Sequence, residues 1–104
     1  MYKERQDVCN PFEPQLSKRE AAVCFALADP TRIDIIHTLE KHAYNVNELT
    51  LELGIPQPRT SRHLRILREQ GLVQSTRHGV SVTYALSDSR LLDALKLLSD
   101  ISAK

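Results

Sequence analysis

The sequence predicts a mainly α-helical domain that carries a single β-hairpin, an α+β fold, and two observations lead to this prediction. Apolar residues recur at helical spacing in five segments, most of which begin at a capping residue or end at a glycine. Between the fourth and the fifth of these segments lie two strand-like runs that are rich in β-branched residues. The length of 104 residues is that of one domain, and a hydrophobic content of 41% is ordinary for a globular protein.

The N-terminal part of the chain divides into an arm and a first helix. Residues 1–15 are polar and hold two prolines, so we interpret them as a flexible arm, and residues 16–104 as the folded domain. The first helix is predicted over Leu16–Ala28, with Ser17 as a candidate cap. Its second half is almost wholly apolar, which indicates burial on more than one side.

A second helix follows at once. Asp29 is a good N-cap and Pro30 suits the first helical position, and the helix is expected to end near Lys41 and His42. Its spacing predicts an apolar face of Ile33, Ile36 and Leu39 and a polar face of Arg32, Asp34 and Glu40.

The next two helices are short and lie close together in the sequence. Asn47 can cap a helix over Glu48–Leu53, which Gly54 ends. A further helix is predicted over Gln57–Gln70, closed by Gly71. Two short helices joined by a turn that contains glycine form a helix-turn-helix.

A hairpin and a last helix complete the chain. Strands are predicted over Leu72–Arg77 and Val80–Leu86, with His78 and Gly79 as the turn. A hairpin directly after a helix-turn-helix occupies the position of a wing, so the predicted architecture is a winged helix-turn-helix. The last helix is predicted over Ser87–Ser102, and its apolar stripe consists of Leu91, Leu92, Leu95, Leu98 and Ile101.

The segment Gln57–Gln70 has the two faces of a DNA-reading helix, one that anchors it to the domain and one that reaches bases and phosphates. The predicted anchoring residues are Thr60, His63, Leu64 and Leu67. The predicted base-facing residues, since Arg pairs with guanine and Gln with adenine, are Gln57, Pro58, Arg59, Ser61 and Arg62. Arg65 and Arg68 lie further along and suit phosphates.

The charge distribution supports double-stranded DNA as the partner, although the net charge is only +1. From Arg59 to Arg77 the chain carries five arginines against a single acid, Glu69. A locally basic face on a near-neutral protein is enough to bind phosphates. The predicted wing contacts to the DNA backbone or minor groove are Arg77, His78, Ser81 and Thr83.

Classes of function other than DNA binding are also compatible with parts of this pattern. The basic helix face could be merely solvated, or the domain could be a winged-helix module for protein–protein contact. The sequence shows no catalytic triad, phosphate loop or paired carboxylates, so an enzyme is not expected. Without an apolar run for export or membrane insertion, we expect a cytoplasmic protein with no membrane partner.

Three segments resemble the ArsR/SmtB family of winged helix-turn-helix repressors. Ala26–Ile33 looks like the opening signature of the family, Asn47–Val73 is similar to its helix-turn-helix, and Arg77–Leu86 resembles its wing. The resemblance implies a homodimer on a pseudo-palindromic operator, with repression relieved by an inducer. It also implies a dimer interface made by the first and last helices, which we expect to involve Leu16, Val23, Leu27, Leu91, Leu92, Leu95, Leu98 and Ile101.

The chain departs from the family pattern in ways that bear on its signal. Pro56 stands where a Ser or Thr often caps the reading helix, and Arg59 where a small residue is common. Asn45 and Asn47 stand where many members have a Cys-x-Cys metal site, and amides are poor ligands for soft metals. The last helix contains no His, and the four histidines, His37, His42, His63 and His78, show no ligand spacing, so no metal site is predicted.

The two cysteines leave three interpretations open. Cys24 can be a small buried hydrophobe and Cys9 an inert exposed thiol of the arm. The arm could instead bring Cys9 to Cys24 for a disulfide or polysulfide bridge. A thiophilic metalloid such as As(III) could also bind the two thiolates, and it is the single cofactor that the sequence suggests.

Overall fold

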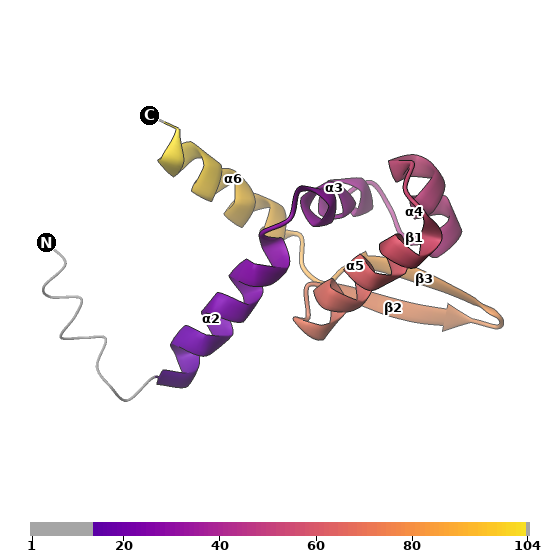
Figure 1. Cartoon of the computed structure of the whole chain (residues 1–104), viewed down its shortest axis with the longest axis horizontal. Coiled ribbons are helices and arrows are strands. Elements are labelled where there is room, and N and C mark those ends of the chain that lie inside the picture. Colours follow the sequence, from indigo (N-terminus) through magenta and orange to yellow (C-terminus); the bar gives the residue numbers. More distant parts are fainter. Residues whose placement is uncertain (1–13, 104) are drawn as a thin grey trace, which may run out of the picture.

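The computed structural model describes residues 14–103, and the predicted order of four helices, a hairpin and a last helix is confirmed (Figure 1). The helices are α2 (Pro14–Leu27), α3 (Pro30–Leu39), α4 (Val46–Leu53), α5 (Gln57–Glu69) and α6 (Arg90–Ser102). The strands are β1 (Tyr44–Asn45), β2 (Val73–His78) and β3 (Ser81–Leu86). The fold is therefore a winged helix-turn-helix, and one short strand, β1, was not predicted.

Helix α2 differs from its prediction in both extent and burial. It begins at Pro14, two residues before the predicted start at Leu16, and Ser17 lies inside the helix and is not a cap. Proline is well tolerated at a helix start, because it has no N–H to leave without a partner. The expected burial of the second half is also wrong, since Ala26 is buried but Phe25 is 65% exposed.

Helix α3 begins as predicted and ends early. The side chain of Asp29 accepts hydrogen bonds from the backbone N–H groups of Thr31, at 2.8 Å, and Arg32, at 3.4 Å. The helix ends at Leu39, before the predicted end near His42. Its buried residues are Arg32, Ile35, Ile36, Thr38 and Leu39, whereas Ile33 is half-buried.

The helix-turn-helix is formed by α4 and α5. The cap of α4 is Asn45 and not Asn47, because the Asn45 side chain accepts from the Glu48 N–H while the Glu48 side chain accepts from the Asn45 N–H, each at 2.8 Å. Gly54 ends α4 with a φ of 68°, a left-handed conformation that favours glycine. Helix α5 begins at Gln57, as predicted, and ends one residue before the predicted end.

The three strands form an antiparallel sheet in the order β1-β3-β2. His78 pairs with Ser81, so the hairpin turn is Gly79–Val80 and not His78–Gly79. Gly79 has a φ of 66°, and as the first of two loop residues it fits the tight turns that match strand twist. The register places Tyr44 beside Tyr84, which ties the start of the helix-turn-helix to the hairpin.

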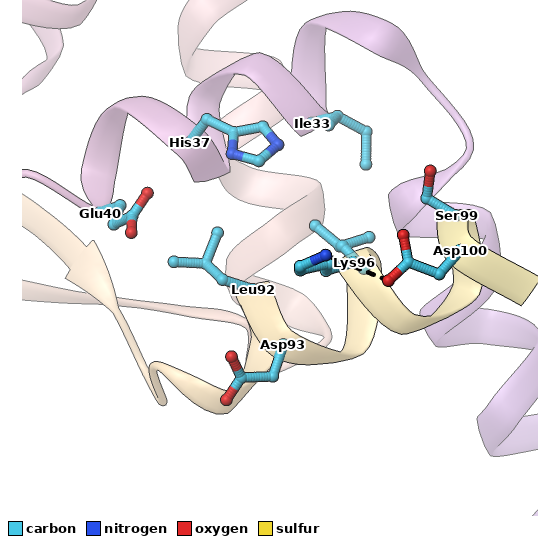
Figure 2. A pocket seen from close by; sticks show the side chains of 9 residues that line it. Ile33, His37, Glu40, Leu92, Asp93, Lys96, Ser99 and Asp100 are labelled. Carbon is cyan, nitrogen blue, oxygen red and sulfur yellow. Dashed lines mark hydrogen bonds and ion pairs between the residues drawn. The ribbon is translucent and has the colours of Figure 1, made fainter.

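Helix α6 begins at Arg90, three residues after the predicted start. Asp88 precedes it and accepts from the Arg90 N–H at 2.8 Å, and hydrogen bonds from the Arg90 guanidinium lower the pKa of this exposed carboxyl to about 2. Figure 2 shows Ile33 and His37 of α3 facing Leu92 of α6 across a cleft of about 650 Å³. The helix is thus only partly packed against its own domain.

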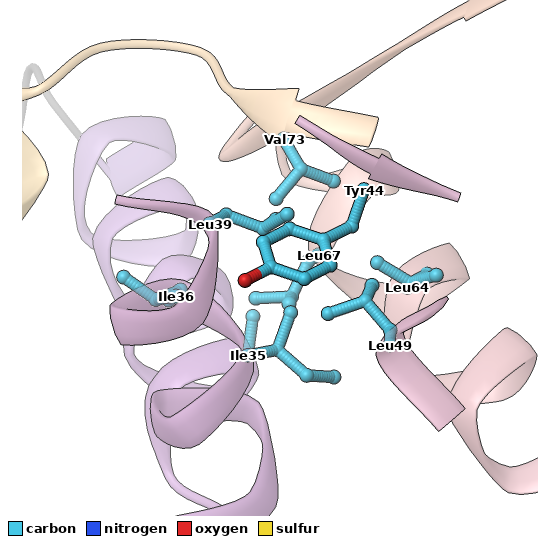
Figure 3. Close-up of a cluster of buried hydrophobic side chains, with 9 residues drawn as sticks. Ile35, Ile36, Leu39, Tyr44, Leu49, Leu64, Leu67 and Val73 are labelled. Carbon is cyan, nitrogen blue, oxygen red and sulfur yellow. The ribbon is translucent and has the colours of Figure 1, made fainter. Parts of the chain in front are cut away.

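The hydrophobic core lies between α3, the helix-turn-helix and the start of the hairpin (Figure 3). Each of these elements contributes at least one buried side chain, and α2 adds Ala26 to the same cluster. The buried hydrophobic residues are Ala26, Ile35, Ile36, Leu39, Tyr44, Leu49, Leu64, Leu67 and Val73. This core fixes α5 through its inner face and leaves its outer face free.

The side chain of Arg32 joins three helices. It is 6% exposed, and its Nε and Nη2 donate to the carbonyls of Ala26, at 2.7 Å, and Phe25, at 3.2 Å. These carbonyls lie in the last turn of α2, where helical carbonyls run out of partners within the helix, although the Phe25 carbonyl also accepts from the Ala28 N–H at 3.1 Å. Nη1 lies 3.1 Å from Nδ1 of His63 on α5. The predicted place of Arg32 on the polar face is therefore wrong, because the interior satisfies its donors.

We expect Arg32→Leu to lower the free energy of unfolding by about 2–3 kcal/mol, because two carbonyls and an imidazole nitrogen lose their donor in the interior. Urea unfolding followed by circular dichroism measures the change. The matched control is Arg65→Leu, since Arg65 is exposed and pairs only with exposed Glu69 at 3.3 Å. Equal losses in the two variants would contradict the structural role of Arg32.

Candidate nucleic-acid interface

Helix α5 has two clearly different faces, as the sequence predicted. The four predicted anchoring residues, Thr60, His63, Leu64 and Leu67, are all buried. All seven predicted contact residues on this helix are exposed: Gln57, Pro58, Arg59, Ser61, Arg62, Arg65 and Arg68. The helix therefore offers four arginines to solvent from a scaffold that its inner face holds in place.

Hydrogen bonds at the start of α5 fix it against α4. Pro56 has no side-chain acceptor, but its carbonyl accepts from the N–H groups of Arg59, at 3.0 Å, and Thr60, at 3.1 Å. The buried Thr60 hydroxyl also accepts from the Thr50 hydroxyl of α4 at 3.0 Å. The proline thus replaces a side-chain cap with a stiff entry to the helix, and the threonine pair sets how the two helices meet.

The electrostatics of α5 separate its inner and outer faces. Burial lowers the pKa of His63, and the positive charges of Arg32, Arg62 and Arg59 lower it further, against the opposing effect of Asp29. His63 is therefore a packed, neutral, hydrogen-bonded residue, as predicted. The positive charge of this helix lies on the outer face, where phosphates could reach it.

The hairpin presents most of its predicted contact residues to solvent. Arg77, His78 and Ser81 are exposed, whereas Thr83 is half-buried in the sheet between β1 and β2. The sequence did not predict the exposure of Val80, which is complete at the tip of the turn. A single apolar residue beside a glycine gave no periodic signal that could have revealed it.

The structure brings the start of α5 and the tip of the hairpin to the same hollow. This hollow has a volume of about 270 Å³ and is bordered by the beginning of α4 as well. Its lining residues are Asn45, Val46, Asn47, Gln57, Val80, Ser81 and Val82. Gln57 and Ser81, predicted separately as DNA contacts, therefore border one surface, and Arg65 and Arg68 lie further along α5.

The predicted sensing residues are only partly within the described chain. Cys24 is exposed on α2, so its interpretation as a buried hydrophobe is wrong. Cys9 lies outside the described residues, and the three thiol interpretations that involve it stay predictions. Within residues 14–103, the structure shows no group of three His, Cys, Asp or Glu side chains that could hold a metal ion.

The predicted dimer residues divide into two sets. Leu27, Leu91, Leu92 and Leu95 pack partly against the core of their own chain, and Val23 is half-buried. Leu16, Leu98 and Ile101 are exposed, as are two apolar residues that the sequence did not single out, Phe25 and Leu97. Exposed apolar side chains are thus concentrated on α2 and α6.

The molecule is elongated at the end that carries this exposed apolar surface. Helices α2 and α6 extend away from the helix-turn-helix, at the end opposite to the hairpin tip (Figure 1). The radius of gyration is 16.2 Å, whereas a compact domain of about 100 residues has about 13 Å. Among the described residues, no helix is both long and apolar enough to cross a membrane.

Comparisons with known proteins agree with this architecture. The family model for bacterial regulatory proteins of the arsR family matches residues 29–75. The HTH-type transcriptional repressor SmtB of Mycobacterium tuberculosis is 44% identical over 66 residues, which are 64% of this chain and 49% of that repressor. The chain therefore spans about half the length of this relative. The transcriptional regulator NmtR of the same organism is 34% identical over 85 residues, 82% of this chain and 71% of NmtR.

Solved structures show the same fold. NolR from Sinorhizobium fredii superposes with a TM-score of 0.78 at 30% identity, over 89% of this chain and 93% of NolR. A homodimeric winged helix-turn-helix DNA-binding domain from Mycobacterium bovis superposes with a TM-score of 0.82 at 23% identity, over 91% of each chain. The relatives are regulators of transcription and not enzymes. With its helix-turn-helix and hairpin matched in sequence and in structure, the chain belongs to the ArsR family of bacterial regulatory proteins.

Proposed function

We propose that this protein is a sequence-specific DNA-binding transcriptional repressor that acts as a homodimer on a pseudo-palindromic operator. The observation that carries the proposal is the exposed arginine face of α5, opposite to a fully buried inner face. A helix anchored in this way can enter the major groove without disturbing the domain behind it. Repression rather than activation is supported by the relative SmtB, which is named a transcriptional repressor.

The exposed residues of α5 have different roles in DNA recognition, which depend on their position along the helix. Gln57, Arg59 and Arg62 lie in the first half of the helix, which enters the groove first, and they can read base edges. Arg65 and Arg68 lie in the second half and suit phosphates, which position the protein without reading sequence. The exposed hairpin residues Arg77 and His78 would reach the flanking backbone or minor groove.

The homodimer is supported by the exposed apolar residues of α2 and α6. Leu97, Leu98 and Ile101 are each about 60% exposed on one helix, and Phe25 is 65% exposed on the other. Large apolar side chains that are exposed together on one part of a domain mark a protein interface. Two copies joined through these helices would present their α5 helices to successive major grooves. A small regulator of transcription of this kind acts in the cytoplasm.

A protein–protein module built on the same fold is the alternative. It would use α5 to contact an acidic partner and would show no preference among DNA sequences. The salt dependence of DNA binding separates the two, since each phosphate contact that releases a counterion steepens the dependence.

Replacing Arg62 by alanine should weaken specific DNA binding by about 1–3 kcal/mol and relax the preference at one base pair, because a bidentate base contact is lost. The probe is a duplex selected from a random-sequence library with the full chain, and fluorescence anisotropy gives the affinity. Arg68→Ala should instead weaken binding to all sequences and reduce the salt slope by about 1.

The control for these variants is Lys41→Ala, which removes an exposed positive charge outside α5 and the hairpin. It should leave both the affinity and the base preference unchanged. Full affinity in Arg62→Ala would overturn the placement of α5 in the groove. Failure of the wild-type chain to enrich any duplex would overturn DNA recognition itself.

The substitution Leu98→Asp should raise the dissociation constant of the dimer at least about tenfold, because a carboxylate would be buried in an apolar contact. Sedimentation equilibrium measures this constant. Leu51→Asp is the matched control, since Leu51 is 83% exposed on α4, away from α2 and α6. If both variants remain dimers of equal stability, the interface does not include this part of α6.

If thiol chemistry is the signal, Cys24→Ser and Cys9→Ser should each abolish the release of the selected duplex by an inorganic polysulfide or arsenite. The expected release in the wild-type chain is about 5–150-fold in affinity, the usual range of coupling between two sites. Release that persists in Cys24→Ser would exclude both thiol mechanisms.

A further inference from the structure

The hydrogen bond between Arg32 and His63 has a fixed direction. Arginine carries donors only, so Nδ1 of His63 must accept from Nη1 through its lone pair, over 3.1 Å. The ring proton of the neutral imidazole therefore lies on Nε2. Because both side chains are 6% exposed, water cannot easily replace either partner.

The surroundings of His63 oppose a second proton on its ring. Arg32 faces it from α3, and Arg59 and Arg62 add positive charge from its own helix. Asp29, in the turn between α2 and α3, is the acidic group that favours protonation. Burial and the three arginines prevail, so the pKa of His63 is lowered and the ring is neutral near neutral pH.

We propose that Arg32 and His63 form a positioning pair, in which the neutral imidazole holds α5 in its DNA-reading orientation and protonation of Nδ1 releases it. The proposal rests on the function proposed above for α5. A protonated Nδ1 would become a donor that faces another donor, and a positive ring would lie against a positive guanidinium. The bond would then be replaced by repulsion.

The position of His63 explains why α5 would respond. Among the described residues, α5 makes two side-chain hydrogen bonds to other helices: Thr60 accepts from Thr50 of α4, and His63 accepts from Arg32 of α3. Thr60 and His63 are three positions apart, which is nearly one helical turn along the inner face. Losing the second would leave the turn with Arg62 and Arg65 held only by apolar contacts such as those of Leu64 and Leu67, while the start of the helix keeps its hydrogen bond to α4.

The same guanidinium also links α5 to α2. Arg32 donates to the carbonyls of Phe25 and Ala26, and its charged end lies 5.6 Å from the centre of the exposed Phe25 ring. Arg32 therefore contacts both the end of α2, which is expected in the dimer interface, and α5, which is expected on DNA. Movement of either helix must be accommodated by Arg32.

The first test uses nuclear magnetic resonance of the full chain without DNA. As the pH is lowered from about 7.5 to the lowest value at which circular dichroism still shows a folded chain, the Nδ1 resonance of His63 should shift to that of a protonated nitrogen. The amide resonances of Arg59 and Arg62 should change with the same midpoint, which lies below that of an ordinary histidine. In His63→Gln, whose amide oxygen can still accept from Arg32, these amide changes should vanish. In His37→Gln, the matched change at an exposed histidine of α3, they should persist.

The second test measures affinity for the selected duplex. The ratio of the dissociation constants of wild type and His63→Gln should rise about tenfold between about pH 7.5 and a pH below the measured midpoint of the His63 titration, as a coupling of ordinary size. Taking the ratio cancels titration of the other histidines. His63→Leu, which cannot accept, should bind weakly at both pH values while circular dichroism shows that it is folded.

The outcomes separate this proposal from the proposed function. A selected duplex that binds with a ratio independent of pH would overturn the positioning pair and leave DNA binding intact. If the amide resonances of α5 do not change as His63 titrates, the proposed positioning pair is overturned as well. If no duplex is selected, the proposed function fails, and the magnetic resonance titration alone still decides whether His63 positions α5.

Discussion

The arrangement of the helices depends on the burial of one positive charge. A guanidinium can leave water only if its donors find acceptors, and a buried charge without partners would cost far more than a domain of this size can spare. Arg32 finds them at the end of α2 and on the inner face of α5. The Ala26 and Phe25 carbonyls and the neutral imidazole of His63 accept from this guanidinium, so they satisfy its donors while it satisfies their need for a partner. The orientation of three helices follows from this one set of contacts.

A second constraint is the amount of apolar surface that a single chain can hide. The core is filled by α3, the helix-turn-helix and the first residue of β2, with Ala26 as the buried contribution of α2. In the part of the chain that the structure describes, α6 has no fully buried residue, although leucines recur along it. The domain is thus divided into a well-packed half that contains the helix-turn-helix and an open half whose apolar residues on α2 and α6 stay exposed in the single chain. In the homodimer proposed above, this division would let the relative position of the two α5 helices change without repacking either core.

The sequence predicted those features that depend on local chemistry and periodicity. The cap at Asp29, the glycine ends and the two faces of α5 all belong to this class, and they were enough to establish the fold and the candidate interface. The burial of Arg32 could not be predicted, because its acceptors come from α2 and from a residue 31 positions away. Strand β1 depends in the same way on pairing with β3. Exposure of Phe25 depends on what the neighbouring helices leave uncovered, which no spacing reveals.

The capping box of α4 makes the start of this helix an unfavourable place for a signal to act. Asn45 lies where the resemblance places a metal-binding cysteine in many members of the family, and here its side-chain oxygen accepts from the Glu48 N–H while its own N–H donates to Glu48. A residue that satisfies two groups at a helix start is committed to structure, since removing such a cap costs about 1 kcal/mol. The start of α4 is therefore held in place by this pair of hydrogen bonds. A signal that alters DNA binding has more freedom to act through α2 and α6, whose apolar faces are the least packed in the described chain.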